Sequence, residues 1–191
     1  KYYLGTDGAR RTGWQTIGEN KYYFNSKGVM TKGWATIDGN KYYFGKISGK
    51  LATGWTTISG KKYYFGTDGV KQTGWITVGS NKYYLGTDGV RRTGWRTIDG
   101  NRYYFGKSSG QLYTGWATIG GKKYYLGTDG VMVTGKQTIN GVVYEFGKDG
   151  VLKGKVEEQD KEPDKQPEND QTTKDNKSDN EDNTKSNLEN N

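Results

Sequence analysis

Short runs in which apolar and polar residues alternate come in pairs along most of the chain, and a turn separates the two runs of each pair. Residues 34–37 and 40–44 form one such pair around Asp38-Gly39, which is a strong signal for a two-residue type I′ hairpin. Successive side chains of a strand alternate between the two faces of the hairpin. In this register one face carries Trp34, Thr36, Lys41 and Tyr43, and the other carries Ala35, Ile37, Tyr42 and Phe44.

The hairpin pattern repeats about every 20 residues. A Gly-Trp dipeptide recurs at spacings of 20, 21, 20, 20 and 21 residues, and a Tyr-Tyr pair follows each tryptophan. The second tyrosine lies nine positions after the tryptophan in all six complete units, so the same cross-strand register is expected in each. The predicted cross-strand pairs are Trp14 with Tyr23, Trp34 with Tyr43, Trp55 with Tyr64, Trp75 with Tyr84, Trp95 with Tyr104 and Trp116 with Tyr125.

The face that carries Ile, Tyr and Phe or Leu is the better candidate for a shared core. Only 30% of the residues are hydrophobic, whereas 31 residues are glycine and 14% are aromatic, so a conventional central core is not expected. A single hairpin is marginally stable in water, but stacked hairpins bury one another's apolar faces. The sequence therefore predicts an all-β fold, a β-solenoid of stacked hairpins with one hairpin in each repeat.

A longer period of 61 residues accompanies the shorter one. It separates Trp14 from Trp75 and Trp34 from Trp95. Two connectors between hairpins, residues 45–49 and 106–110, have one more residue than the others, and they are three repeats apart. These observations indicate duplication of a three-hairpin unit. If three hairpins make one superhelical turn, both longer connectors project from the same side.

The ends of the array differ from its middle. Tyr2-Tyr3 belongs to the second half of a unit, so we expect residues 1–154 to be an array truncated at its N-terminus. In the last unit Lys136 replaces the tryptophan and Glu145 the second tyrosine, which suits a polar cap where stacking stops. Residues 155–191 contain no aromatic residue and have twelve acidic residues against six lysines, so we expect a disordered acidic linker or tail.

The charge is divided unevenly along the chain. The net charge is +8, the segment 155–191 contributes −6, and residues 1–154 therefore carry +14. A basic array favours polyanions or anionic surfaces in a salt-dependent way.

No apolar run approaches the length of a membrane span, so membrane insertion is not expected.

Candidate catalytic chemistry is absent from the sequence. There is no histidine and no cysteine, and the aspartates of the connectors occur one per turn rather than in converging pairs. Asp-Gly turn chemistry explains these aspartates better than calcium binding does. We therefore expect no catalytic residue, no metal site and no cofactor, and we exclude an enzyme.

Each Trp–Tyr pair has two interpretations. It is either a packing element between hairpins or an aromatic platform for sugar rings, with Lys, Thr and Asn donating hydrogen bonds to hydroxyl groups. The position before each Tyr-Tyr pair is always basic, and it is either a solvated strand edge or a contact for phosphate groups. Both questions stay open here. The basic column consists of Lys21, Lys41, Lys62, Lys82, Arg102 and Lys123.

Residues 33–44, which read Gly-Trp-Ala-Thr-Ile-Asp-Gly-Asn-Lys-Tyr-Tyr-Phe, resemble the cell-wall-binding repeat family. This family includes choline-binding modules of pneumococcal proteins, glucan-binding repeats of streptococcal glucosyltransferases and receptor-binding repeats of clostridial toxins. The resemblance extends over residues 1–154. It implies a left-handed solenoid with three hairpins per turn and ligands between consecutive hairpins. It also implies a secreted or cell-surface protein of a Gram-positive bacterium.

The resemblance implies particular ligand-binding residues as well. In choline-binding members a cage combines the Gly-Trp tryptophan, a second tryptophan just before Tyr-Tyr and a tyrosine of the next hairpin. The first and third elements match Trp34 and, for example, Tyr64. The second is basic here and would repel a quaternary ammonium group, so the sequence is more similar to the toxin and glucan-binding branches. The candidate ligand-binding residues are Trp14, Tyr23, Trp34, Tyr43, Trp55, Tyr64, Trp75, Tyr84, Trp95, Tyr104, Trp116, Tyr125, Lys41, Lys62, Lys82 and Arg102.

The expected partner is a bacterial cell-wall polymer or polysaccharide, such as glucan or teichoic acid. Toxin-like attachment to a host glycan and a purely structural stalk are the alternatives. Nucleic acid is not an expected partner, because the acidic segment and the resemblance both argue against it.

Overall fold

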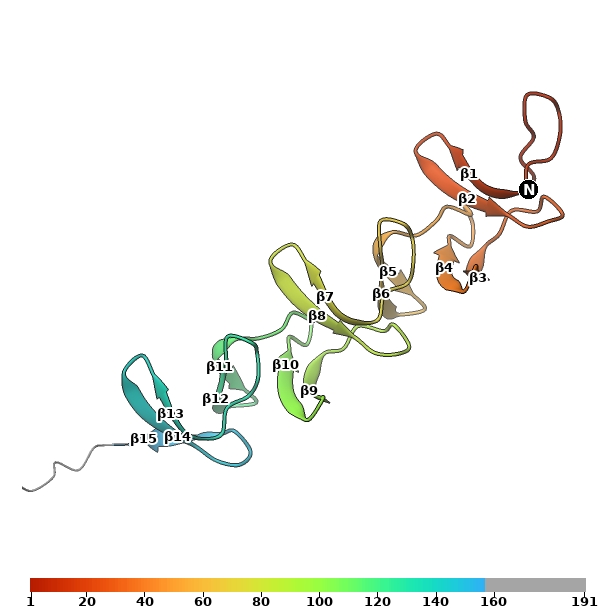
Figure 1. The fold of residues 1–191 in the computed structure, drawn as a ribbon. Helices are drawn as coiled ribbons and strands as arrows, with labels where there is room; N and C mark the ends of the chain where they lie inside the picture. The colour runs from red at the N-terminus through yellow and green to blue at the C-terminus, as the bar shows by residue number, and fades with distance from the viewer. Residues whose placement is uncertain (157–191) are drawn as a thin grey trace, which may run out of the picture. The chain divides into compact units, whose positions relative to one another are not determined.

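The computed structural model describes residues 1–156, which form a succession of β-hairpins (Figure 1). The acidic segment predicted for residues 155–191 lies outside the described residues except for its first two positions. Within the described part, fourteen strands form seven hairpins and a fifteenth strand joins the last one. The strands are β1 (Gly13–Ile17), β2 (Asn20–Phe24), β3 (Gly33–Ile37), β4 (Asn40–Phe44), β5 (Gly54–Ile58), β6 (Lys61–Phe65), β7 (Gly74–Val78), β8 (Asn81–Leu85), β9 (Gly94–Ile98), β10 (Asn101–Phe105), β11 (Gly115–Ile119), β12 (Lys122–Leu126), β13 (Gly135–Ile139), β14 (Val142–Phe146) and β15 (Leu152–Lys155).

The register of the hairpins is the one that the turn chemistry predicts. In β3–β4, Trp34 lies opposite Tyr43 and Ala35 lies opposite Tyr42. Asp38 and Gly39 have φ angles of 48° and 77°, so both central residues of the turn have the positive φ of a type I′ turn. The same Trp–Tyr register occurs in all six hairpins that contain a tryptophan.

The core is a series of small clusters between consecutive hairpins, and it lies on the face predicted for it. Ile37 and Tyr42 are buried, and Phe44 has no exposed surface. Trp14 of the preceding hairpin packs on this face, with its ring 5.1 Å from Tyr42 and 5.8 Å from Phe44. The tryptophan face of each hairpin therefore covers the phenylalanine or leucine face of the next one.

The connectors between hairpins are tight turns that are closed by their own hydrogen bonds. In residues 66–70 the backbone N–H of Val70 donates to the Asp68 carboxylate at 3.0 Å, as expected for an aspartate that shapes a turn. The N–H of Gly69 donates to the Gly66 carbonyl three residues back. In the two longer connectors the corresponding bond spans four residues, as from Gly49 to Gly45, so the extra residue enlarges only the turn.

The solenoid repeats its orientation every three hairpins. In Figure 1 the hairpins β1–β2, β7–β8 and β13–β14 project in the same direction, and β3–β4 has the same position as β9–β10. This repeat agrees with the 61-residue period of the sequence. The two longer connectors follow β4 and β10, so they occupy equivalent places in successive turns.

The last hairpin ends the stack with an added strand. Lys136 lies opposite Glu145, as predicted for the polar cap. The ion pair of Glu145 is made with Lys153 of β15, at 2.8 Å from Nζ to Oε1, because β15 adds to the free edge of β14. The N–H of Val156 then donates to the Val143 carbonyl. The edge strand of the final unit is thus covered by the chain itself.

Candidate ligand grooves between hairpins

Open grooves of similar composition lie between consecutive hairpins. The groove beside Trp34 is lined by this tryptophan, Lys41 of the same hairpin, Tyr63 of the next hairpin, and Lys71 and Asp88 of two later connectors. Each such groove thus receives side chains from three successive units. Equivalent grooves lie beside Trp14, Trp55 and Trp75, with volumes from about 200 Å³ at Trp55 to about 330 Å³ at Trp14.

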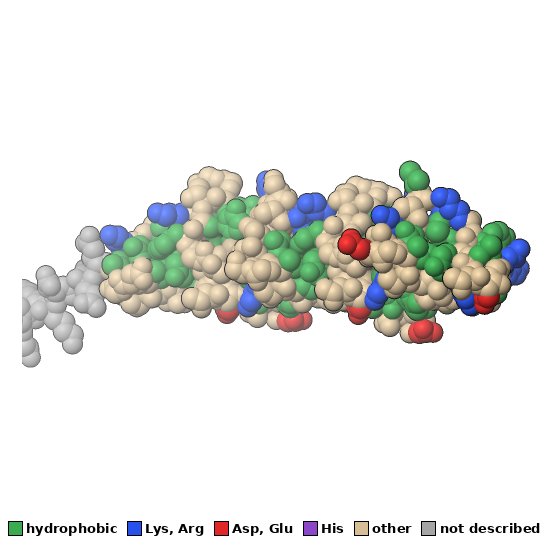
Figure 2. All heavy atoms as spheres, turned by 90° about the horizontal axis from the view of Figure 1, so that it is seen from above, with side chains coloured by type: hydrophobic (Ala, Val, Ile, Leu, Met, Phe, Trp, Pro, Cys, Tyr) green, Lys and Arg blue, Asp and Glu red, His purple; other side chains and the backbone are tan. Residues whose placement is uncertain are grey.

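The tryptophan of each groove both packs and remains accessible. The Trp34 ring meets Tyr43 of its own hairpin edge-on at 5.2 Å and Tyr63 of the next hairpin at 5.1 Å. It nevertheless keeps 38% of its surface exposed, and Trp14, Trp75 and Trp116 have similar exposure. Figure 2 shows hydrophobic side chains as separate patches along the array, with Lys and Arg beside them. The packing and platform interpretations are therefore compatible.

The tyrosine that the next hairpin contributes differs from the one expected. Trp34 packs against Tyr63, the first tyrosine of the pair, and Tyr64 instead packs against Trp55 of its own hairpin at 5.1 Å. The expectation for Tyr64 was wrong because consecutive residues of a strand point to opposite faces. The face assignment made from the sequence already contained this signal. The first tyrosines that line the grooves are Tyr42, Tyr63, Tyr83 and Tyr103.

The second tyrosines support the tryptophans from within each hairpin. Every one of them meets its cross-strand tryptophan at 5.1 or 5.2 Å. None is among the residues that line the grooves beside Trp14, Trp34, Trp55 and Trp75. These supporting residues are Tyr23, Tyr43, Tyr64, Tyr84, Tyr104 and Tyr125.

The side chains of the basic column are exposed. Four of its members line the grooves beside Trp14, Trp34, Trp55 and Trp75, namely Lys21, Lys41, Lys62 and Lys82. Lys41 Nζ is 5.9 Å from the centre of the Trp34 ring, and Lys123 Nζ is 5.3 Å from that of Trp116. The Arg102 guanidinium is 4.8 Å from the centre of the Trp95 ring. These distances are in the range of a cation–π contact. The chain's own cation thus contacts an indole at the position where the second tryptophan of a choline cage was expected.

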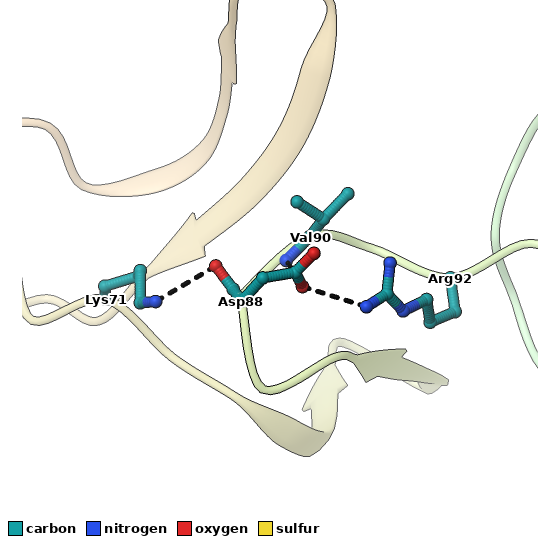
Figure 3. A network of polar contacts seen from close by, with 4 residues as sticks. All are labelled: Lys71, Asp88, Val90 and Arg92. Atoms are coloured by element: carbon teal, nitrogen blue, oxygen red, sulfur yellow. Dashed lines mark hydrogen bonds and ion pairs between the residues drawn. The ribbon is translucent and has the colours of Figure 1, made fainter.

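Sequence reasoning did not find the connector residues of the grooves. Asp88 belongs to the connector after β8, yet it lines the groove between β3–β4 and β5–β6. Its carboxylate accepts hydrogen bonds from the Val90 N–H at 2.9 Å and from Arg92 at 3.0 Å (Figure 3). The Val90 bond and the Arg92 charge lower the pKa of Asp88. Its backbone carbonyl accepts a bond from Lys71 Nζ at 3.0 Å. Side chains of different units meet in this groove only because the hairpins stack, so the sequence of a single repeat does not predict it.

Residues 1–156 contain no helix long and apolar enough to cross a membrane. Within the same residues, no three acidic, histidine or cysteine side chains lie close enough together to hold a metal ion.

The fold and the grooves define a class of protein: a hairpin-repeat solenoid with aromatic grooves between its units. A family model described as the choline-binding repeat matches residues 11–53, 52–85, 72–114 and 113–155. The chain therefore belongs to the choline-binding repeat family. A search of curated protein sequences finds no match.

Solved structures of pneumococcal proteins are similar to the array. CbpJ from Streptococcus pneumoniae is 33% identical with a TM-score of 0.73, and choline binding protein F from Streptococcus pneumoniae is 36% identical with a TM-score of 0.71. Both alignments cover 79% of this chain, and they cover 55% and 54% of those chains. The autolysin LytC from Streptococcus pneumoniae is 28% identical with a TM-score of 0.60, over 81% of this chain and 36% of that chain. The chain thus spans about half the length of the first two proteins.

Proposed function

We propose that residues 1–156 form a non-catalytic binding module that attaches a secreted or surface protein of a Gram-positive bacterium to a cell-wall polymer or polysaccharide. The observation that carries this proposal is the groove that recurs between hairpins, with an indole that is 38–40% exposed in the grooves beside Trp14, Trp34 and Trp75. A single open groove of this kind binds weakly. Several grooves on one array bind a repeating polymer with avidity, because the second contact is intramolecular.

The chemistry of the grooves suits a carbohydrate-containing chain. The exposed part of an indole packs on the C–H face of a sugar or polyol, while Lys and Thr donate hydrogen bonds to hydroxyl groups. In the Trp14 groove these donors are Thr16 and Lys21. Choline binding protein F has been solved in the presence of a peptidoglycan analogue, and LytC in complex with a synthetic peptidoglycan ligand. These relatives support a wall polymer as the partner.

A binding experiment with defined polymers tests the proposal. Purified walls, walls stripped of teichoic acid, α-glucan and a panel of host glycans are incubated with the array, and binding is followed by co-sedimentation and tryptophan fluorescence. We expect binding to at least one wall polymer or glucan. Host glycans as the sole ligands would indicate the toxin-like function instead. Binding to none of the polymers would leave a structural rod.

A matched pair of variants separates the grooves from the rest of the surface. The double variant Trp34→Phe/Trp75→Phe keeps a ring against the neighbouring tyrosines but reduces the exposed aromatic area, so we expect affinity to fall about tenfold. The control is Ile47→Ala, at a connector position that is 89% exposed and outside the grooves. Its affinity should equal that of the unmodified chain. Equal losses in both variants would contradict binding through the grooves.

A further inference from the structure

One backbone hydrogen bond places a connector residue beside each member of the basic column from Lys21 to Arg102. The N–H of Lys71 donates to the Lys41 carbonyl, and the N–H of Arg91 donates to the Lys62 carbonyl, both at 2.8 Å. In these two units the neighbouring side chains are both cationic. In the other units the connector residue is apolar, with Leu51 beside Lys21, Leu112 beside Lys82 and Met132 beside Arg102.

The groove beside Trp34 contains two ammonium groups and little compensating charge. Lys41 and Lys71 both line it, and burial followed by the charge of Lys41 lowers the pKa of Lys71. Asp88 is the acidic residue of this groove, but its carboxylate is engaged by Arg92 and the Val90 N–H (Figure 3). Lys71 bonds only the neutral carbonyl of Asp88.

The next groove, beside Trp55, has two cations and no carboxylate among its lining residues. Lys62 and Arg91 line it together with Ser109. The Arg91 guanidinium donates to the carbonyls of Ser108 and Ser109, which are neutral acceptors. Both serines belong to the longer connector 106–110, which has no aspartate. The inserted connector thus removes the one acidic residue that the equivalent position supplies in the other three grooves.

The grooves beside Trp14 and Trp75 provide an internal comparison. Each contains one lysine and one aspartate among its lining residues: Lys21 with Asp68, and Lys82 with Asp129. Their formal charges cancel, whereas the two grooves between them keep a net positive charge. The chain therefore carries two kinds of groove, and the cationic kind occupies two consecutive positions.

We propose that the grooves beside Trp34 and Trp55 are phosphate subsites for a polyol-phosphate polymer. This inference rests on the wall-polymer function proposed above and specifies the chemistry of the polymer. A phosphate accepts charge-assisted hydrogen bonds from both cations of a groove, and the adjacent indole packs on the carbon chain between phosphates. A quaternary ammonium group is repelled from these same grooves.

The test uses isothermal titration calorimetry with poly(glycerol phosphate), neutral α-glucan and single-stranded DNA of equal phosphate number, at two salt concentrations. The double variant Lys71→Leu/Arg91→Leu gives both connectors the leucine that occurs at positions 51 and 112, so it suits the fold. We expect its affinity for poly(glycerol phosphate) to fall about tenfold or more. The slope of log K against log salt should fall by about two.

A charge-matched control separates local contacts from net charge. Lys27→Ser/Lys46→Ser removes two exposed lysines from connectors outside the grooves, and its affinity should change less than about twofold. Equal losses in the two double variants would overturn the proposal. So would stronger binding of DNA than of poly(glycerol phosphate) by the unmodified chain.

The titration with α-glucan distinguishes the proposed phosphate subsites from the proposed attachment to a wall polymer or polysaccharide. Binding of glucan without binding of poly(glycerol phosphate) refutes the phosphate subsites and leaves the attachment function standing. If the unmodified chain binds neither polymer and no other wall component, both proposals fail together. The variant Leu112→Arg adds a second cation to the Trp75 groove, and increased affinity for poly(glycerol phosphate) would support the assignment from the opposite direction.

Discussion

Trp34 contacts Tyr43 within its hairpin and Tyr63 and Phe65 of the next hairpin, so replacing it with alanine measures how strongly the aromatic groups hold two units together. The side chain is 38% exposed, and most of the indole is therefore removed from water by neighbouring rings. An aromatic side chain of this size buries roughly 150 Å² in such a position, which corresponds to about 4 kcal/mol at about 25 cal/mol per Å². Trp34→Ala should thus destabilise the interface by about 3–5 kcal/mol.

The effect should remain local, because each hairpin of a solenoid contacts only its neighbours. Hydrogen exchange with mass spectrometry is the appropriate assay, since one melting temperature does not describe an array whose units open separately. We expect amides of β3–β6 to exchange more than about 100-fold faster, while those of β11–β12 keep their rates. Trp34→Phe, which retains a ring against Tyr63, should cost about 1–2 kcal/mol.

Two results would refute this reasoning. Unchanged exchange in β3–β6 would mean that the tryptophan contributes little to stacking and serves the groove alone. Equal acceleration in every hairpin would mean that the array unfolds as one cooperative body, so that stability is not a sum over neighbouring interfaces.

Other consequences of the structure are open to direct measurement. Gly69→Ala places a β-carbon 2.5 Å from a leucine of the preceding connector at a φ of +83°, whereas Gly74→Ala meets open space at +73°. By hydrogen exchange of the adjacent hairpins, the first variant should cost about 2–4 kcal/mol and the second about 1 kcal/mol. Equal effects would contradict tight connector packing. The hydrogen bond and then the charge of Lys153 hold the pKa of Glu145 below its ordinary value of 4.5, so this contribution is present above pH 4.5 and is lost as the pH falls further. The protection factors of the β15 amides, which are corrected for the intrinsic pH dependence of exchange, should fall in acid, and Glu145→Gln should remove that dependence. Lys82→Trp supplies an aromatic wall in place of the only cation that lines the Trp75 groove. Calorimetry should therefore detect an affinity for choline at least about tenfold above that of the unmodified chain, and no gain would contradict the role given to the basic column.

Much of the fold could be predicted from one repeat. The Asp38-Gly39 turn fixes the register, the register fixes which side chains share a face, and the structure has Trp34 opposite Tyr43 as predicted. The 61-residue period indicates a three-hairpin unit, and the hairpins of Figure 1 repeat their orientation with that period. These features can be predicted from the sequence because they depend on residues within one hairpin or recur with the repeat.

The grooves could not be predicted from one repeat, because they form only where hairpins stack on one another. Lys71 and Asp88 come from connectors that follow later hairpins. Nothing in the sequence distinguishes these two residues from other residues of the turns. The choice of Tyr63 over Tyr64 depends on which face of one hairpin covers the next.

The sequence by itself determined the repeating unit, its turn, its strand register and the face that is buried, because each of these depends on residues within one hairpin. Only the tertiary structure decided which connectors reach which groove and where two cations meet without a carboxylate. The physical reason is that side chains from three successive units converge in one groove, and their contacts are set by the rise and rotation between units rather than by any single unit.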